Sequence, residues 1–206
     1  ELGAKILLPS GYLNIAVFDQ TIDGFQSNTF IGTGFVLANA GSQSADGYEF
    51  DLVYSPLENL DLMMSGVFLD PIYDSFPGSA FGDLSGTTTS NIPEDTITTS
   101  LTWNWDMNGW AGYTRLSHLY SSEAILLENP QAQAIIESQG NGFRKMDTLN
   151  FSAGIEKDNL SISLYGQNVN DDEYLTSAFV AVTDFTSTTY FGCLLYTSPS
   201  PRDLST

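Results

Sequence analysis

Four tight turns divide this chain, and long polar segments lie between them. The turns are Leu8–Gly11, Ser55–Asn59, Asp106–Gly109 and Glu156–Asn159, and strand-like segments flank each one. Successive turns lie about fifty residues apart, which is room for two long strands and one long loop. Short connections that alternate with long ones are typical of an outer-membrane β-barrel. The pattern therefore favours a membrane sheet with all its tight turns at one end.

Several segments alternate apolar and polar residues with period two, as half-buried strands do. They are 48–55, 96–106, 149–156 and 160–167. One face of 96–106 carries Ile97, Thr99, Leu101, Trp103 and Trp105, and the other carries Thr96, Thr98, Ser100, Thr102, Asn104 and Asp106. A slip of one residue would exchange the two faces, so the pattern also fixes the strand register.

The alternation and the turns together predict an all-β fold, an antiparallel meander of about eight to nine strands. The strands are expected near 1–8, 12–27, 43–55, 60–70, 95–106, 109–122, 145–157 and 160–170, with the start of a ninth at 184–192. Residues 12–19 and 110–120 alternate poorly and are assigned from their position alone. The long loops are expected near 28–42, 71–94, 123–144 and 171–183. In the third loop, 124–127 and 132–136 could form a short helix or an extra turn.

Charge limits the partners of the chain. It carries Lys+Arg 6 against Asp+Glu 25, a formal net charge of -19. A nucleic-acid surface needs clustered basic residues, so we expect no nucleic-acid partner. No run of eighteen apolar residues is present, and hence no transmembrane helix is predicted.

Both ends of the sequence are unusual. Glu1–Lys5 begins as though already inside a strand and contains no signal peptide, so we expect the start to be a cut. Residues 193–206 break the preceding pattern and resemble a translated sequencing adaptor. We therefore expect this tail not to be natural protein, which would remove Cys193, the single cysteine, from any thiol argument.

Aromatic residues gather beside the tight turns. They are Tyr12, Tyr54, Trp103, Trp105 and Trp110. In a membrane barrel such residues form a girdle at the lipid–water interface, and this is the expectation here. In a soluble β-sandwich the same residues would be core or edge aromatics.

Several stretches, in this order, resemble the C-terminal part of the barrel of TonB-dependent outer-membrane receptors. They are ELGAK at 1–5, LNIAVFDQTIDGFQ at 13–26, GYEFDLVYSPLENLDL at 47–62, DLSGTTTSNIPEDT at 83–96, SLYGQNVNDDEY at 163–174 and TSTTYFG at 186–192. Each motif alone is weak, and their order and spacing carry the resemblance. It covers residues 1–192, which we expect to be a partial barrel domain.

The resemblance implies a fragment of a large transmembrane β-barrel in the outer membrane of a Gram-negative bacterium. It implies active uptake of a scarce nutrient such as an iron chelate, a cobalamin or a glycan, with 28–42, 71–94 and 123–144 as outer loops that help to capture it. The implied partners are outer-membrane lipid and lipopolysaccharide, a small-molecule nutrient, and TonB through an N-terminal plug region that this sequence does not contain.

Catalytic signals are weak. His118 is the single histidine, and a pairing with Ser117 or Ser121 is the only candidate for a catalytic pair. The acidic stretch Asn168–Glu173 resembles a cation loop, but it lacks the glycine and the distant glutamate of an EF-hand. We interpret it as a turn at a strand end. We therefore expect no enzymatic activity, no cofactor and no metal site, and the sequence identifies no substrate-binding residue.

Acidic residues mark the second long loop at Asp70, Asp74, Asp83, Glu94 and Asp95. The default interpretation is solvated loop charge. The functional interpretation is contact with a substrate, or with divalent ions at the lipopolysaccharide surface.

Two other functions remain open at this point. One is a small passive or structural outer-membrane barrel of about eight to ten strands. The other is a secreted β-sandwich binding module, which would show Greek-key order.

Overall fold

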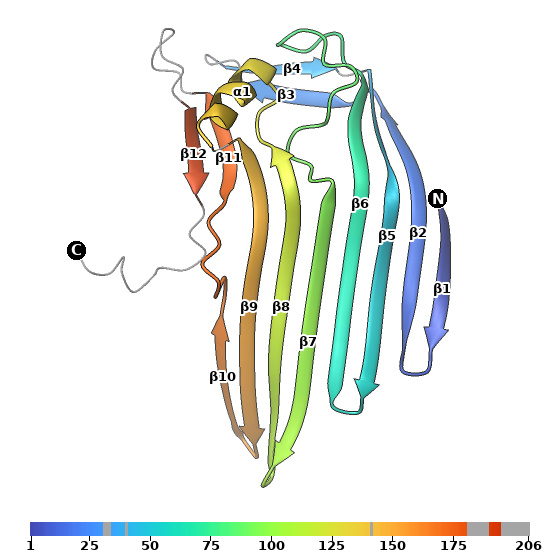
Figure 1. Cartoon of the computed structure of the whole chain (residues 1–206), viewed down its shortest axis with the longest axis vertical. Coiled ribbons are helices and arrows are strands. Elements are labelled where there is room, and N and C mark those ends of the chain that lie inside the picture. Colours follow the sequence, from blue (N-terminus) through green and yellow to red (C-terminus); the bar gives the residue numbers. More distant parts are fainter. Residues whose placement is uncertain (31–33, 40, 141, 181–189, 195–206) are drawn as a thin grey trace, which may run out of the picture.

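One antiparallel sheet dominates the molecule (Figure 1). The structure is a computed structural model that describes residues 1–30, 34–39, 41–140, 142–180 and 190–194. Eight strands lie side by side in the order β1-β2-β5-β6-β7-β8-β9-β10. Their bounds are Leu2–Leu8 (β1), Gly11–Asp23 (β2), Ser42–Leu57 (β5), Leu60–Ser75 (β6), Asp95–Met107 (β7), Trp110–Ile125 (β8), Phe143–Lys157 (β9) and Leu160–Gly166 (β10). This order confirms the predicted meander. The alternative of a β-sandwich with Greek-key order is wrong.

Tight turns connect the strands at one end, as predicted. Asn108 and Gly109 join β7 to β8 with φ angles of 54° and 80°. Positive φ at both central residues, with an Asn-Gly sequence, is the hairpin geometry that matches the twist of the flanking strands. Asp158 begins the turn between β9 and β10 with a φ of 54°.

The two faces of the sheet differ in chemistry. Directly paired residues share a face, so Leu62, Leu101, Leu116 and Phe151 form one row across β6 to β9. We call the face that carries this row the apolar face. The opposite face, here the polar face, is covered by side-chain hydrogen bonds between strands. They include Asn14–Asp51, Ser55–Asp61, Ser65–Thr98, Asn104–Asp61, Arg115–Thr102 and Ser117–Ser100.

Aromatic residues border the apolar face at the turn end. Tyr54, Trp103, Trp105 and Trp110 belong to this face, and Lys157 Nζ lies 5.7 Å from the ring centre of Trp110. Tyr12 does not, because it pairs with Val53 on the polar face, where Lys5 Nζ lies 4.6 Å above its ring. The poor alternation of 12–19 concealed this orientation.

The loop end contains more regular structure than the sequence predicts. The expected loop 28–42 contains part of a hairpin, β3 (Gln26–Phe30) and β4 (Phe35–Asn39), and the expected loop 171–183 contains all of β11 (Leu175–Val180). Apolar and β-branched residues in 35–37 favour strand despite the flanking glycines. β6 and β8 also continue beyond their predicted ends, to Ser75 and Ile125.

The last strand of the described chain is β12 (Tyr190–Leu194), which pairs with β11 in a separate two-stranded sheet. It overlaps the strand predicted at 184–192, of which 184–189 lie outside the described residues. Of the tail expected to be non-native, 195–206 lie outside them as well. No helix in the described ranges is long and apolar enough to cross a membrane.

Candidate ligand-binding site at the loop end

A short helix organises the segment between β8 and β9. This helix, α1 (Pro130–Ser138), begins after Asn129, whose side-chain oxygen accepts hydrogen bonds from the backbone N–H groups of Gln131 and Ala132. Such a cap satisfies donors that the first helical turn leaves unpaired, and proline suits the first helical position. The helix includes 132–136, where the sequence predicts a helix or an extra turn, but 124–127 are not helical, because β8 continues to Ile125.

Gln133 attaches this helix to the chain that precedes it. Gln133 follows Leu126 by 7 residues in sequence, and it is only 5% exposed. Its Oε1 accepts from the N–H groups of Leu126 and Leu127 at 3.2 and 3.0 Å, and its Nε2 donates to the carbonyl of Gly142 at 2.6 Å. These bonds fix the course of residues 126–129 and thereby the position of Glu128.

The loop after β6 folds back over its own strand. Tyr73 N–H donates to Thr87 O, and Thr89 N–H donates to Pro71 O, at 2.9 and 2.8 Å. Tyr73 and Leu84 are each 3% exposed and Phe76 is fully buried, and Phe25 packs against these three. The ring centroids of Tyr73 and Phe76 are 5.1 Å apart. The loop therefore has a small hydrophobic core of its own.

A carboxylate joins two distant segments above this core. Glu128 Oε1 accepts a hydrogen bond from Ser27 Oγ of the β3–β4 hairpin at 2.7 Å, and another from Tyr73 OH at 3.0 Å. Burial and the neighbouring Glu128 carboxylate raise the pKa of Tyr73, so its hydroxyl remains a donor at neutral pH. Ser27 and Glu128 are 101 residues apart in sequence.

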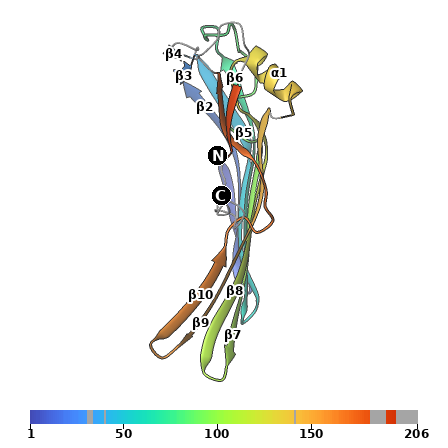
Figure 2. The same ribbon diagram turned by 90° about the vertical axis from the view of Figure 1, so that its left-hand side faces the viewer.

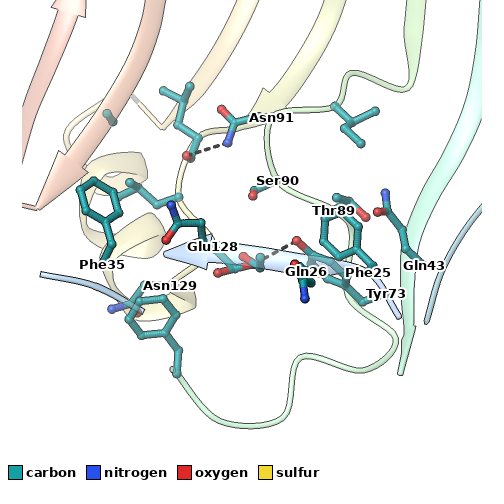
Figure 3. Close-up of a pocket in the computed structure, with 17 residues that line it drawn as sticks. Phe25, Gln26, Phe35, Gln43, Tyr73, Thr89, Ser90, Asn91, Glu128 and Asn129 are labelled. Carbon is teal, nitrogen blue, oxygen red and sulfur yellow. Dashed lines mark hydrogen bonds between the residues drawn. The ribbon is translucent and has the colours of Figure 1, made fainter. Parts of the chain in front are cut away.

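These elements enclose a cavity of about 580 Å³, which we call the loop cavity (Figure 3). Its aromatic lining is Phe25, Phe35, Tyr73 and Phe81. Amide side chains such as Gln43 and Asn91 and hydroxyls such as Thr89 provide its polar groups, and Glu128 is its one charged residue among the described lining. A cavity with apolar walls and a few placed polar groups is the usual form of a small-molecule site.

None of the acidic residues singled out from the sequence lines this cavity. Asp70 lies on the apolar face of β6, and Asp74 accepts a hydrogen bond from Ser44 at 2.8 Å. Asp83 accepts from the backbone N–H of Ser85, and hydrogen bonds from Ser85 hold the pKa of Asp83 below its usual range. Asp83 thus has a local turn role, and Asp74 links β6 to β5.

Asp70 belongs to a row of three aspartates. Asp19 pairs with Asp46, and Asp46 pairs with Asp70, so the three carboxylates cross β2, β5 and β6 at one level. All three are exposed. Directly below them lie Tyr48 and Phe68, whose rings stack with centroids 4.6 Å apart. The row marks the upper limit of the apolar face.

The catalytic pair considered from sequence does not form. His118 Nε2 lies 2.6 Å from Asp147 Oδ1, and His118 pairs with Leu149 on the apolar face. Ser117 faces the opposite side and bonds to Ser100, and Ser121 also belongs to that side. No group of three or more metal-ligating side chains occurs in the described part of the chain.

The stretch Asn168–Glu173 completes the edge of β9, beyond the point where β10 ends. Asp172 accepts from Asp147 N–H at 2.7 Å, Asn170 accepts from Leu149 N–H at 2.8 Å, and Val169 N–H donates to Leu149 O at 2.7 Å. These polar groups substitute for a neighbouring strand. The interpretation as a strand-end turn is confirmed.

Comparison with known proteins agrees with this architecture. The model of the TonB-dependent receptor-like β-barrel family matches residues 1–169, so the chain belongs to this family. The family is one of receptors and transporters, not enzymes. A search of curated proteins found no match.

Solved structures with the same fold are longer receptors. The ferric yersiniabactin uptake receptor FyuA from Yersinia pestis is 16% identical with a TM-score of 0.71, over 94% of this chain and 27% of that one. The ferric preacinetobactin receptor BauA from Acinetobacter baumannii is 14% identical with a TM-score of 0.65, over 93% of this chain and 26% of that one. The chain thus spans about a quarter of each.

Sequence reasoning identified no residue of this site, and Glu128 is the most informative one that it missed. The Asn129-Pro130 pair indicates the start of a helix, and Glu128 is the residue directly before this pair. No local pattern, however, indicates that this residue meets Ser27 and Tyr73 from two other loops.

Proposed function

We propose that this chain forms part of the barrel wall of a larger outer-membrane receptor that takes up an iron chelate by active transport. The loop cavity carries the proposal, because it gathers aromatic and polar side chains from three loops at one end of the sheet. Solved proteins of the same fold are named for ferric siderophores, which supports the same substrate class here.

The two faces of the sheet support a place in the membrane. The apolar face would contact lipid, with Trp103 and Trp105 at the periplasmic interface and Tyr48 and Phe68 at the outer one. β7 crosses the region between these levels with about ten residues, the length a tilted strand needs to span a bilayer. The row formed by Asp19, Asp46 and Asp70 would then meet the lipopolysaccharide headgroups and their bound divalent cations.

The polar face would line the lumen and face a plug. In this arrangement the loop cavity opens toward the outside and takes part in capture, and TonB supplies energy through the N-terminal region of the full receptor. The hairpin at 26–39, the loop at 76–94 and the segment at 126–142 are the capture loops.

Uptake by the full-length receptor tests the proposal. The gene would be expressed in a Gram-negative strain that lacks its own iron-chelate receptors, and radiolabelled ferric chelates would be supplied. We expect uptake that requires TonB and is lost when residues 78–86 are deleted while the barrel still assembles. Uptake that continues without TonB would overturn the proposal, and so would the absence of uptake with every ferric chelate supplied.

A further inference from the structure

The loop cavity presents one negative charge and no described positive one. Glu128 lies among aromatic and amide side chains, and its Oε1 is held by both Ser27 and Tyr73 (Figure 3). Two donors on one oxygen fix the carboxylate in place, so it cannot swing away from an arriving ligand. An anion in the cavity would experience this fixed charge at short range, where solvent screens it least.

The basic residue Arg144, near the start of β9, is bonded to the cavity wall and does not line the cavity. Arg144 Nη2 donates to the backbone carbonyl of Asn91 at 2.7 Å, and Arg144 is not among the residues that line the cavity. It supports the wall from outside. Lys145 lines a separate cavity. Arg144 therefore has a structural partner, and it does not present its charge to a ligand as an anion-binding arginine would.

The other described polar side chains that line the cavity are neutral. Thr89 is 3% exposed, and its Oγ1 forms no hydrogen bond. Gln43, 7% exposed, also lines the cavity (Figure 3). A ligand with uncharged acceptors or donors, such as amide or hydroxamate oxygens, would suit the neutral amide and hydroxyl side chains of the lining, and its apolar parts would contact Phe25 and Phe35.

We infer that the loop cavity selects ferric chelates by charge: it accepts a chelate without net negative charge, and Glu128 disfavours anionic chelates. The inference rests on the proposed function and narrows its substrate class. Three hydroxamate groups neutralise Fe(III), whereas three catecholates leave a trianionic complex. The geometry therefore points to hydroxamate-type chelates over catecholate-type ones.

Equilibrium binding to the purified full-length receptor tests this, with quenching of intrinsic fluorescence as the signal. The probes are a ferric trihydroxamate of no net negative charge and a ferric tricatecholate. We expect the wild-type receptor to bind the hydroxamate at least about tenfold more tightly, the preference that a single close charge produces at a partly screened site.

Two variants separate charge from geometry. Glu128→Gln keeps an oxygen that accepts from Ser27 and Tyr73 and removes the charge, so it should reduce the preference on the order of tenfold. Glu123→Gln is the matched control, because Glu123 is an exposed carboxylate on β8 that lines a different cavity. It should leave the preference unchanged.

Salt dependence supplies a measurement that needs no variant. Raising NaCl from about 0.05 M to about 0.5 M shortens the screening length and weakens the repulsion between Glu128 and an anionic chelate. The affinity for the tricatecholate should therefore increase, and the affinity for the trihydroxamate should not change.

The outcomes distinguish this inference from the proposed function. Binding of neither chelate would overturn the proposed function and the inference with it. Equal binding of both, a preference that Glu128→Gln leaves intact, or an equal effect of Glu123→Gln would overturn charge selection by Glu128 and leave the iron-chelate receptor standing.

Discussion

The loop end of this molecule buries its apolar residues, whereas the strands leave theirs exposed. Among the described residues, the buried apolar side chains come from the loop end, between Pro71 and Ile136 in sequence. The strands instead leave large apolar residues open, with Leu101 at 42%, Trp103 at 52% and Ile162 at 52% exposed. Figure 2 shows the same division, with the helix and hairpin gathered above long, bending strands.

The difference indicates that the loop end lies in water and the apolar face of the strands in lipid. A loop in water must bury its apolar groups within the protein, so it builds a core around Phe76. A strand in lipid gains nothing by hiding its leucines, and it satisfies its polar side chains on the other face. One chain thus follows the rules of a water-soluble domain at one end and of a membrane sheet along its strands. The predictions that follow test this division.

The largest effect should follow from Phe76→Ala. Removal of a fully buried phenylalanine typically costs about 3–5 kcal/mol, and here the loss falls on the loop core alone. Hydrogen exchange at the Leu84 and Thr89 amides, both bonded within this core, should accelerate strongly. The control is Leu57→Ala, 60% exposed at the turn end, which should leave these amides protected. Unchanged exchange in Phe76→Ala would show that the loop has no core of its own.

The second effect concerns the apolar face. Leu101 lies at the middle of this face, and an arginine at the centre of a lipid-facing band costs about 2–4 kcal/mol. Leu101→Arg should therefore lower the denaturant midpoint of the receptor refolded in lipid vesicles. Ser100→Arg, one residue away on the polar face, should be tolerated. If both variants unfold alike, the two faces do not meet different surroundings.

The third effect depends on pH and is confined to the loop end. The raised pKa of Tyr73 means that the folded loop keeps this proton when the unfolded chain loses it. The stabilisation is complete below the ordinary tyrosine pKa of about 10 and decreases as the pH rises above it. Exchange of the Thr89 amide should thus become faster above about pH 10 than its intrinsic rate explains. In Tyr73→Phe this extra acceleration should disappear, and its persistence there would assign it to another group.

The smallest effect lies in a tight turn. Gly109 has a φ of 80°, and alanine at such a position costs about 1 kcal/mol. Gly109→Ala should lower vesicle stability by that amount and leave chelate binding at the loop end unchanged. The control Gly78→Ala lies in the exposed loop with open space around it. A loss of binding in Gly109→Ala would indicate coupling between the two ends.

Prediction from sequence succeeded for features that depend only on neighbouring residues in the chain. Alternation in 96–106 assigned Leu101 and Ser100 to opposite faces, and Asn108-Gly109 located a hairpin, because periodicity and φ preferences are local. The same approach misplaced Tyr12, whose segment is apolar on both faces. It could not find Glu128, because contacts among three loops depend on side chains that meet across the fold and leave no periodic trace.

Thiol labelling in whole cells tests the central claim, that the loop end faces outside and the turn end faces the periplasm. Ala80→Cys and Glu58→Cys place single thiols at exposed positions of the two ends, in a receptor whose other cysteines are replaced by serine. A membrane-impermeant maleimide should label position 80 in intact cells, and position 58 only after the outer membrane is permeabilised. Labelling of position 58 in intact cells, with position 80 protected, would contradict the account.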